Sequence, residues 1–135
     1  MINILNNQPI ETYHIDCTYD INLNKFSVLN FGLSDCSGQF FLISSCIISH
    51  ETEMDFQFFY QTLNEICIFF KYKLNLKFIM QDACVASYNA AKSIFGENVT
   101  ILMCYFHLLK NVKEKIRGWI EQELIINCVR KLHFC

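Results

Sequence analysis

Proline and glycine are scarce in this sequence, which holds one proline and four glycines among 135 residues. Disordered, low-complexity and collagen-like chains are rich in one or both of these residues, so those classes are excluded. Hydrophobic residues make up 53% of the chain and aromatic residues 15%. We therefore expect one densely packed domain at residues 11–135, preceded by a short amino-terminal extension at residues 1–10.

Long hydrophobic runs are also missing. The longest runs, such as residues 40–43 and 66–70, are far shorter than the roughly 18 residues that a membrane-spanning helix needs, so we expect no membrane partner. Residues 1–9 are polar and rich in asparagine, and they lack the basic start and apolar stretch of a secretory signal. These features predict an intracellular protein.

The eight cysteines are irregularly spaced and lie mostly inside apolar segments, which argues against a disulfide framework. In a reducing compartment they stay thiols. Cys46, Cys67 and Cys84 are therefore interpreted as small residues of the hydrophobic core.

The net charge is only −2, but the charge is unevenly distributed. Residues 1–100 hold 5 basic and 10 acidic side chains, whereas residues 101–135 hold 6 basic and 3 acidic ones. The carboxyl-terminal part is thus a positive segment attached to an acidic body. On its own this pattern favours a solvated helix face over a nucleic-acid contact.

The first part of the chain has the period of β-strands. Apolar and polar residues alternate over residues 11–22, which places Ile15 and Asp16 on opposite faces of a strand. Two further strands are expected at residues 26–33 and 39–49. The short connections between the three strands predict an antiparallel meander.

After residue 50 the apolar residues recur every three or four positions, which indicates a helix. Thr52 is its expected start, with Asp55 three residues later as in a capping box. The remaining elements follow in order: a strand at residues 76–81, a helix from Asp82 to a stop at Gly96, a strand at residues 99–103, and one helix from Cys104 toward Val129.

The order β-β-β-α-β-α-β-α predicts an α/β fold, with a mixed sheet and helices on its faces. It resembles the order of the ribonuclease-H-like fold, incomplete at the carboxyl end. In that fold the first strand and the later parallel strands are neighbours at the centre of the sheet. This arrangement would bring Asp16 and Asp82 together across 66 residues of sequence.

Asp16 and Asp82 are the candidate catalytic residues. A carboxylate in a central strand is unfavourable unless it is paired, hydrogen-bonded or bound to a cation. Asp82 could equally be the N-cap of the helix that follows it, and the two roles are compatible. Two nearby carboxylates suit Mg²⁺ or Mn²⁺, which can activate a nucleophile for phosphoryl displacement. That chemistry normally needs a third carboxylate, and none is obvious.

Cys104 and His107 are three residues apart, so in a helix their side chains meet on one face. A zinc site usually has four ligands, and the nearest candidates, Cys128, His133 and Cys135, lie more than twenty residues away. A structural or DNA-contacting pair beside the acidic site is therefore favoured over a zinc site.

Four segments resemble the Mutator-like element (MULE) transposase domain, in the order and with the approximate spacing of that family. They are YHIDCTY at residues 13–19, SHETEMDF at 49–56, QDA at 81–83 through NAA at 89–91, and MCYFHLLKNV at 103–112. The resemblance covers about residues 12–117. Each segment alone is weak, but the set is specific.

The resemblance implies a DDE-type DNA strand-transfer core that uses two divalent metal ions and acts in the nucleus. Asp16 and Asp82 would be the first two catalytic carboxylates and metal ligands. Cys104 and His107 would be the family's Cys-x-x-His pair, which handles the DNA strand rather than catalytic metal. The implied partners are DNA and other transposase subunits, with no small-molecule substrate. The residues implied to contact DNA phosphates are Lys110, Lys113, Lys115 and Arg117.

The chain departs from the family pattern at the third acidic residue. The family carries this Glu on a later helix, usually after an all-helical insertion, and Glu121 and Glu123 come too early to match. The zinc fingers common upstream in the family are also missing. We therefore expect a carboxyl-terminally truncated core that is inactive alone. The alternatives are a relict or domesticated DNA- or protein-interaction module, and a structural domain in which hydrogen bonds satisfy both aspartates.

Overall fold

The computed structural model describes residues 12–21, 23–35, 37–72, 74 and 76–132, so the predicted extension at residues 1–10 lies outside the described residues. Its strands are β1 (Thr12–Thr18), β2 (Ser27–Ser34), β3 (Phe40–Ile48), β4 (Phe78–Gln81) and β5 (Thr100–Met103). Its helices are α2 (Glu53–Phe69), α3 (Val85–Phe95), α4 (Tyr105–Lys115) and α5 (Gln122–Leu132). The predicted order of elements is confirmed, except that two helices stand where one was expected.

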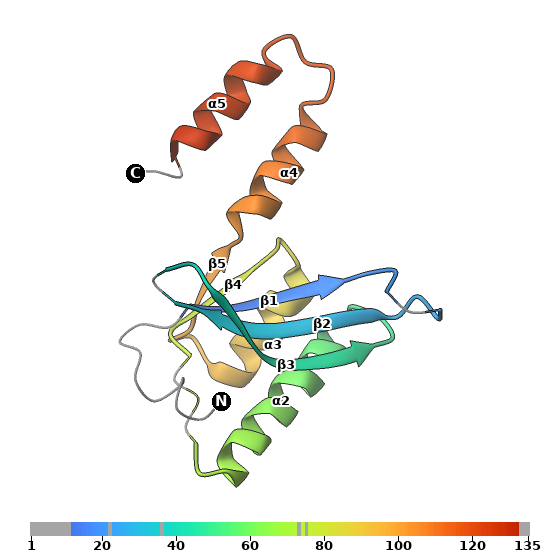
Figure 1. Cartoon of the computed structure of the whole chain (residues 1–135), viewed down its shortest axis with the longest axis vertical. Helices are drawn as coiled ribbons and strands as arrows, with labels where there is room; N and C mark the ends of the chain where they lie inside the picture. Colours follow the sequence, from blue (N-terminus) through green and yellow to red (C-terminus); the bar gives the residue numbers. More distant parts are fainter. Residues whose placement is uncertain (1–11, 22, 36, 73, 75, 133–135) are drawn as a thin grey trace.

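The five strands form one mixed sheet in the order β3-β2-β1-β4-β5 (Figure 1). The first three strands are antiparallel neighbours, whereas β4 pairs with β1, and β5 with β4, in parallel. β1 is therefore the central strand, as the ribonuclease-H-like fold requires, and this fold is confirmed. Two antiparallel steps also make β3 run in the direction of β1. The carboxyl ends of β1, β3, β4 and β5 thus share one edge of the sheet.

Helices α2 and α3 cover one face of this sheet (Figure 1). The alternation in β1 is confirmed, because Tyr13 and Ile15 are buried in the core while Asp16 is exposed on the opposite face. The Tyr13 ring stacks on Phe31 of β2 with ring centroids 5.4 Å apart. Burying each large apolar side chain of this kind stabilises the fold by roughly 1.5–3 kcal/mol. The core therefore fixes which face of β1 carries Asp16.

The carboxyl-terminal helices form a hairpin, which we call the α4–α5 hairpin and which stands away from the sheet (Figure 1). The prediction of one continuous helix from Cys104 toward Val129 is wrong. The chain turns at residues 116–121, where Gly118 has a φ of +86°. Helix α4 has already ended at Lys115, although the apolar spacing continues, and glycine adopts the left-handed conformation of the following turn without a steric penalty.

The described cysteines are all free thiols, namely Cys17, Cys46, Cys67, Cys84, Cys104 and Cys128. Cys46, Cys67 and Cys84 pack against the hydrophobic core, as predicted. Within the described ranges, none of the helices has the length and apolar character required to cross a membrane.

Thr52 begins α2 through a capping box, as the sequence predicts. The Thr52 side-chain oxygen accepts a hydrogen bond from the Asp55 N–H at 3.3 Å, and the Thr52 N–H donates to the Asp55 carboxylate at 3.1 Å. These contacts satisfy amides that a helix start leaves without partners. They also fix the point at which the chain passes from β3 into α2.

Replacing Thr52 tests this cap. We expect Thr52→Ala to lower the free energy of unfolding by about 1 kcal/mol, because the Asp55 amide loses its acceptor. Thr52→Ser keeps a hydroxyl in the same place and should remain within about 0.5 kcal/mol of the native chain. Urea denaturation measures both values. An equal loss in the two variants would contradict the capping role.

Candidate active site

Two carboxylates from distant parts of the sequence line one hollow at the carboxyl edge of the sheet. Asp16 is near the end of β1, and Asp82 directly follows β4. The last residue pair between these parallel strands is His14 with Met80, and each aspartate lies two residues beyond it. The register therefore puts the two predicted site residues at equivalent places on neighbouring strands.

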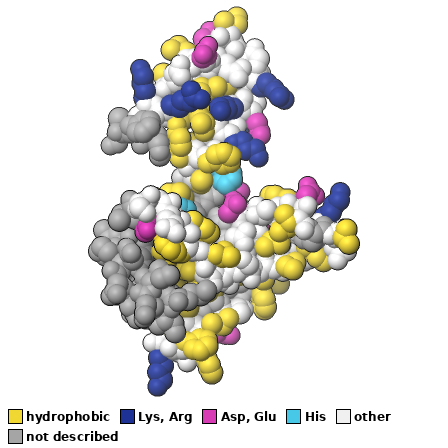
Figure 2. Space-filling view, viewed as in Figure 1, with side chains coloured by type: hydrophobic (Ala, Val, Ile, Leu, Met, Phe, Trp, Pro, Cys, Tyr) yellow, Lys and Arg dark blue, Asp and Glu magenta, His cyan; other side chains and the backbone are white. Residues whose placement is uncertain are grey.

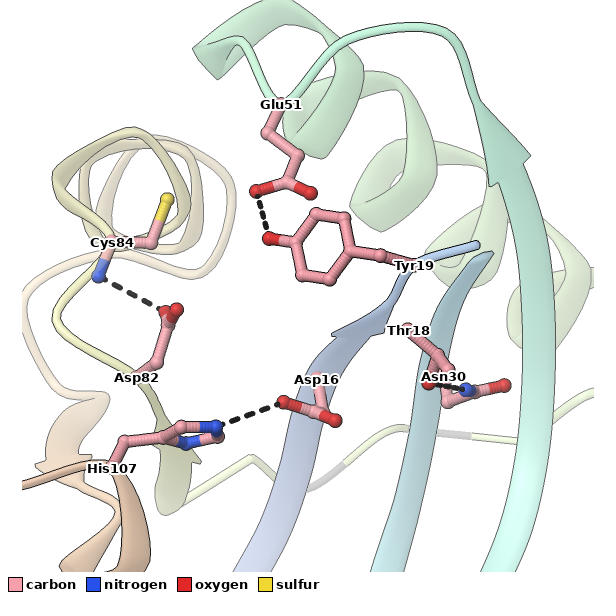
Figure 3. Close-up of polar contacts among 8 residues, drawn as sticks. All are labelled: Asp16, Thr18, Tyr19, Asn30, Glu51, Asp82, Cys84 and His107. Atoms are coloured by element: carbon pink, nitrogen blue, oxygen red, sulfur yellow. Dashed lines mark hydrogen bonds and ion pairs between the residues drawn. The ribbon is translucent and has the colours of Figure 1, made fainter. Parts of the chain in front are cut away.

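Asp16 is half-exposed and faces the first turn of α4. Its Oδ1 lies 3.6 Å from Nε2 of His107, which forms an ion pair with it when the imidazole is protonated (Figure 3). Burial raises the pKa of the Asp16 carboxyl, the neighbouring His107 lowers it, and the charges of Asp82 and Glu51 raise it further. The net effect is upward. Ionising Asp16 in the folded chain is therefore less favourable than in water, mainly because the carboxyl is partly buried.

Asp82 lies in the turn between β4 and α3. Its Oδ1 accepts a hydrogen bond from the Cys84 N–H at 3.0 Å. Cys84, rather than Asp82, is the N-cap of α3, and its side chain makes no capping hydrogen bond. The N-cap alternative for Asp82 is therefore wrong, because Asp82 lies two residues before the N-cap. Its carboxylate accepts the Cys84 amide hydrogen bond and also lines the hollow.

Glu51 is a third carboxylate that lines the same hollow, and the sequence did not predict it as a site residue. It lies in the connection between β3 and α2. The Tyr19 hydroxyl donates to Oε2 of Glu51 at 2.8 Å (Figure 3). The Ser27 hydroxyl donates to Oε1 of Glu51 at 2.9 Å. The signal that could have located it is strand direction, because β3 runs parallel to β1 and ends at the same edge.

Cys104 and His107 begin α4 but contact different groups. Cys104 is the N-cap residue, and its N–H donates to the carbonyl oxygen of Gln81 at 2.6 Å. His107 lies one turn further along and contacts Asp16. Its Nδ1 is buried and has no hydrogen-bond partner among the described residues. The pair therefore attaches α4 to the site at two separate points.

The sequence model of the MULE transposase domain matches residues 12–111 of this chain. The chain belongs to the MULE transposase domain family. The match supports a DDE-type core of the transposase family. No protein of curated function matches the sequence significantly.

One solved structure similar to this MULE domain is the catalytic core domain of the HTLV-2 integrase in complex with magnesium, in its dimeric form. The two chains are 14% identical, with a TM-score of 0.47, and the match covers 90% of this chain and 83% of that chain. A TM-score below 0.5 does not establish a shared fold. The fold of the MULE domain rests on its own strand order.

The predicted DNA-contacting residues of the MULE domain lie on the α4–α5 hairpin, where Figure 2 shows basic side chains gathered. All four are exposed: Lys110, Lys113, Lys115 and Arg117. Lys113 and Arg117 line one hollow with Glu114 and Gln122. At about 100° per residue, Lys113 lies about 60° around α4 from Lys110, whereas Lys115 lies about 140° away. The structure therefore groups three of the four and separates Lys115 from Lys110.

In the described part of the MULE domain, no three His, Cys, Asp or Glu side chains converge closely enough to hold a metal ion together. The two aspartates and Glu51 still provide the hard oxygen donors that Mg²⁺ and Mn²⁺ prefer. The donor chemistry fits a divalent ion, with waters completing its coordination.

Replacing Asp16 by asparagine tests whether the ionised carboxylate destabilises the fold. Because the folded-state pKa of Asp16 is raised, the ionised carboxylate destabilises the fold at any pH above that pKa. We expect Asp16→Asn to raise the melting temperature at pH 7 in the presence of a chelator. The difference in melting temperature should vanish as the pH falls below the ordinary aspartate pKa of about 3.9, where Asp16 is neutral in both the folded and the unfolded chain. A lower melting temperature for Asp16→Asn at pH 7 would contradict this account.

Proposed function

We propose that this chain is part of a DNA transposase core that acts in the nucleus, with a divalent metal ion at Asp16 and Asp82 and DNA along one side of α4. The observation that supports this most is the shared hollow. Two aspartates 66 residues apart in sequence line it together, in a chain whose family match spans residues 12–111.

The charge balance supports Mg²⁺ or Mn²⁺ as the cofactor. Burial raises the pKa of Asp16 most, and the like charges of Asp82 and Glu51 raise it further. A cation between the aspartates would offset both the burial of the charge and this repulsion. Asp16 and Asp82 would hold the ion. When bound, it would supply charge stabilisation to a phosphoryl group during displacement. Asp82 is oriented by the Cys84 amide, and Asp16 faces His107.

The geometry of α4 supports a DNA path that ends at the aspartates. His107, Lys110 and Lys113 follow one another at three-residue intervals, so each lies about 60° around the helix from the previous one. His107 contacts Asp16 at one end of this row. A phosphate backbone bound by Lys110 and Lys113 would therefore run toward the carboxylate pair.

The salt dependence of DNA binding tests this path. The chain should bind duplex DNA weakly and without sequence preference, with an affinity that falls steeply as salt rises. Lys110→Ala and Lys113→Ala should each reduce the slope of log affinity against log salt by about one. Lys115→Ala is the matched control and should reduce it less, because its side chain points to another side of α4. Fluorescence anisotropy measures all three slopes, and equal effects would contradict the proposed orientation.

We propose further that these 135 residues alone do not cut DNA. The described residues contain no convergent set of three metal-ligating side chains. Glu51 is near the pair, but its two oxygens already accept hydrogen bonds from Tyr19 and Ser27. Positioning a second ion generally requires a further acid. A non-catalytic DNA- or protein-interaction module is the second candidate function, and the same observation favours it.

A cleavage assay separates these functions. The purified chain is incubated with labelled duplex DNA and Mg²⁺ or Mn²⁺, beside Asp16→Ala and Glu51→Gln. We expect no cleavage by any of the three. Cleavage that both substitutions abolish would identify Glu51 as the missing acid and would overturn the proposed inactivity. Cleavage that neither substitution affects would indicate a contaminating nuclease.

A further inference from the structure

Gln81 and Ser87 are two of the few buried polar side chains in the described residues. Gln81 is 3% exposed and Ser87 2% exposed, and the fully buried Tyr60 lies beside them. A buried polar group destabilises a fold unless it is hydrogen-bonded. Hydrogen bonds join these three side chains in a single group, which we call the Gln81 clamp.

The Gln81 clamp joins three elements behind the acidic pair. The Ser87 hydroxyl of α3 donates to Oε1 of Gln81 at 2.8 Å, and Nε2 of Gln81 donates to the Cys84 carbonyl at 3.1 Å. The Tyr60 hydroxyl of α2 lies 3.4 Å from the Ser87 hydroxyl oxygen. Because Ser87 has one proton and gives it to Gln81, Tyr60 is the donor in that contact.

Gln81 contacts the residues that begin α3 and α4, next to Asp82 and before His107. The Gln81 side chain donates a hydrogen bond to the Cys84 carbonyl. The Cys84 N–H in turn donates to the Asp82 carboxylate at 3.0 Å. Through its main-chain carbonyl, Gln81 accepts the N–H of Cys104 at 2.6 Å, at the start of α4. One residue therefore contacts both the segment that orients Asp82 and the start of the helix that brings His107 to Asp16.

We propose that Gln81 and Ser87 are positioning residues of the carboxylate site. They hold Asp82 and the start of α4 in fixed positions relative to Asp16. This inference rests on the proposed function, in which Asp82 holds a metal ion. An apolar side chain in place of Gln81 could fill the same space without requiring partners. The polar clamp instead imposes directed contacts, which fix orientation as well as packing.

Ser87→Ala tests the proposal, and Tyr60→Phe is its matched control. Ser87→Ala removes the donor to Gln81 and leaves a buried amide oxygen without that partner. Tyr60→Phe removes a hydroxyl from the same group but keeps the Ser87 to Gln81 and Gln81 to Cys84 hydrogen bonds. Ser87→Cys, of similar volume and with a weaker donor, replaces Ser87→Ala if that variant does not fold.

The first readout is amide hydrogen exchange by nuclear magnetic resonance, which needs no metal. After correction for each variant's unfolding free energy, the Cys84 and Cys104 amides should exchange about tenfold faster in Ser87→Ala than in Tyr60→Phe. Equal corrected rates would overturn the positioning role. The second readout is the dissociation constant for Mn²⁺, which should rise about tenfold in Ser87→Ala and remain unchanged in Tyr60→Phe.

The two readouts separate the failure of this inference from that of the proposed function. If the native chain binds no Mn²⁺, the metal role of Asp16 and Asp82 fails, and the exchange rates still decide whether Gln81 and Ser87 position the site. If the native chain binds Mn²⁺ and both variants bind it equally well, the positioning role is refuted while the proposed metal site stands.

Discussion

The parallel pairing of β1 with β4 is the contact on which the rest of the site depends. Three residue pairs define it, and its last pair, His14 with Met80, lies two residues before Asp16 on one strand and Asp82 on the other. The side-chain period of a strand is two, so a slip of one residue would turn a whole strand over. Tyr13 and Ile79 face each other in this pairing and are fully buried, and their burial fixes the register.

The remaining parts of the site attach to this pair of strands. The antiparallel meander returns β3 to the direction of β1, which brings Glu51 to the same edge. Gln81, the last residue of β4, connects the starts of α3 and α4. The site is thus built by four segments that leave one edge of the sheet, and negative charge accumulates there because three of them carry a carboxylate.

Much of the fold could be predicted from the sequence because its signals are local. The alternation around Ile15 and the capping box at Thr52 each follow from a few neighbouring residues, and the structure confirms both. The end of α4 could not be predicted from the apolar period, because that period continues past Gly118 while the backbone turns there. The turn that follows α4 contains a backbone conformation that glycine favours.

The candidate site was predictable where a motif marked it and not where tertiary structure created it. Asp16 and Asp82 lie in segments that match the family, near the ends of two predicted strands. The predicted strand order makes those strands neighbours, so the convergence of the two aspartates could be predicted. Glu51 also lies in a matched segment, at residues 49–56. Its place in the site, however, depends on the direction of β3 and on hydroxyl donors from Tyr19 and Ser27, which the sequence does not show.

The central claim is that the aspartates at the ends of β1 and β4 hold a divalent metal ion. Anomalous X-ray diffraction from crystals soaked in Mn²⁺ tests it most directly, with an Asp82→Asn crystal soaked in parallel. The account predicts an anomalous peak between the Asp16 and Asp82 carboxylates of the native chain, at the Mn²⁺–oxygen distances of an octahedral site, and a weakened or absent peak in Asp82→Asn. Manganese bound elsewhere, with no peak between these two carboxylates, would contradict it.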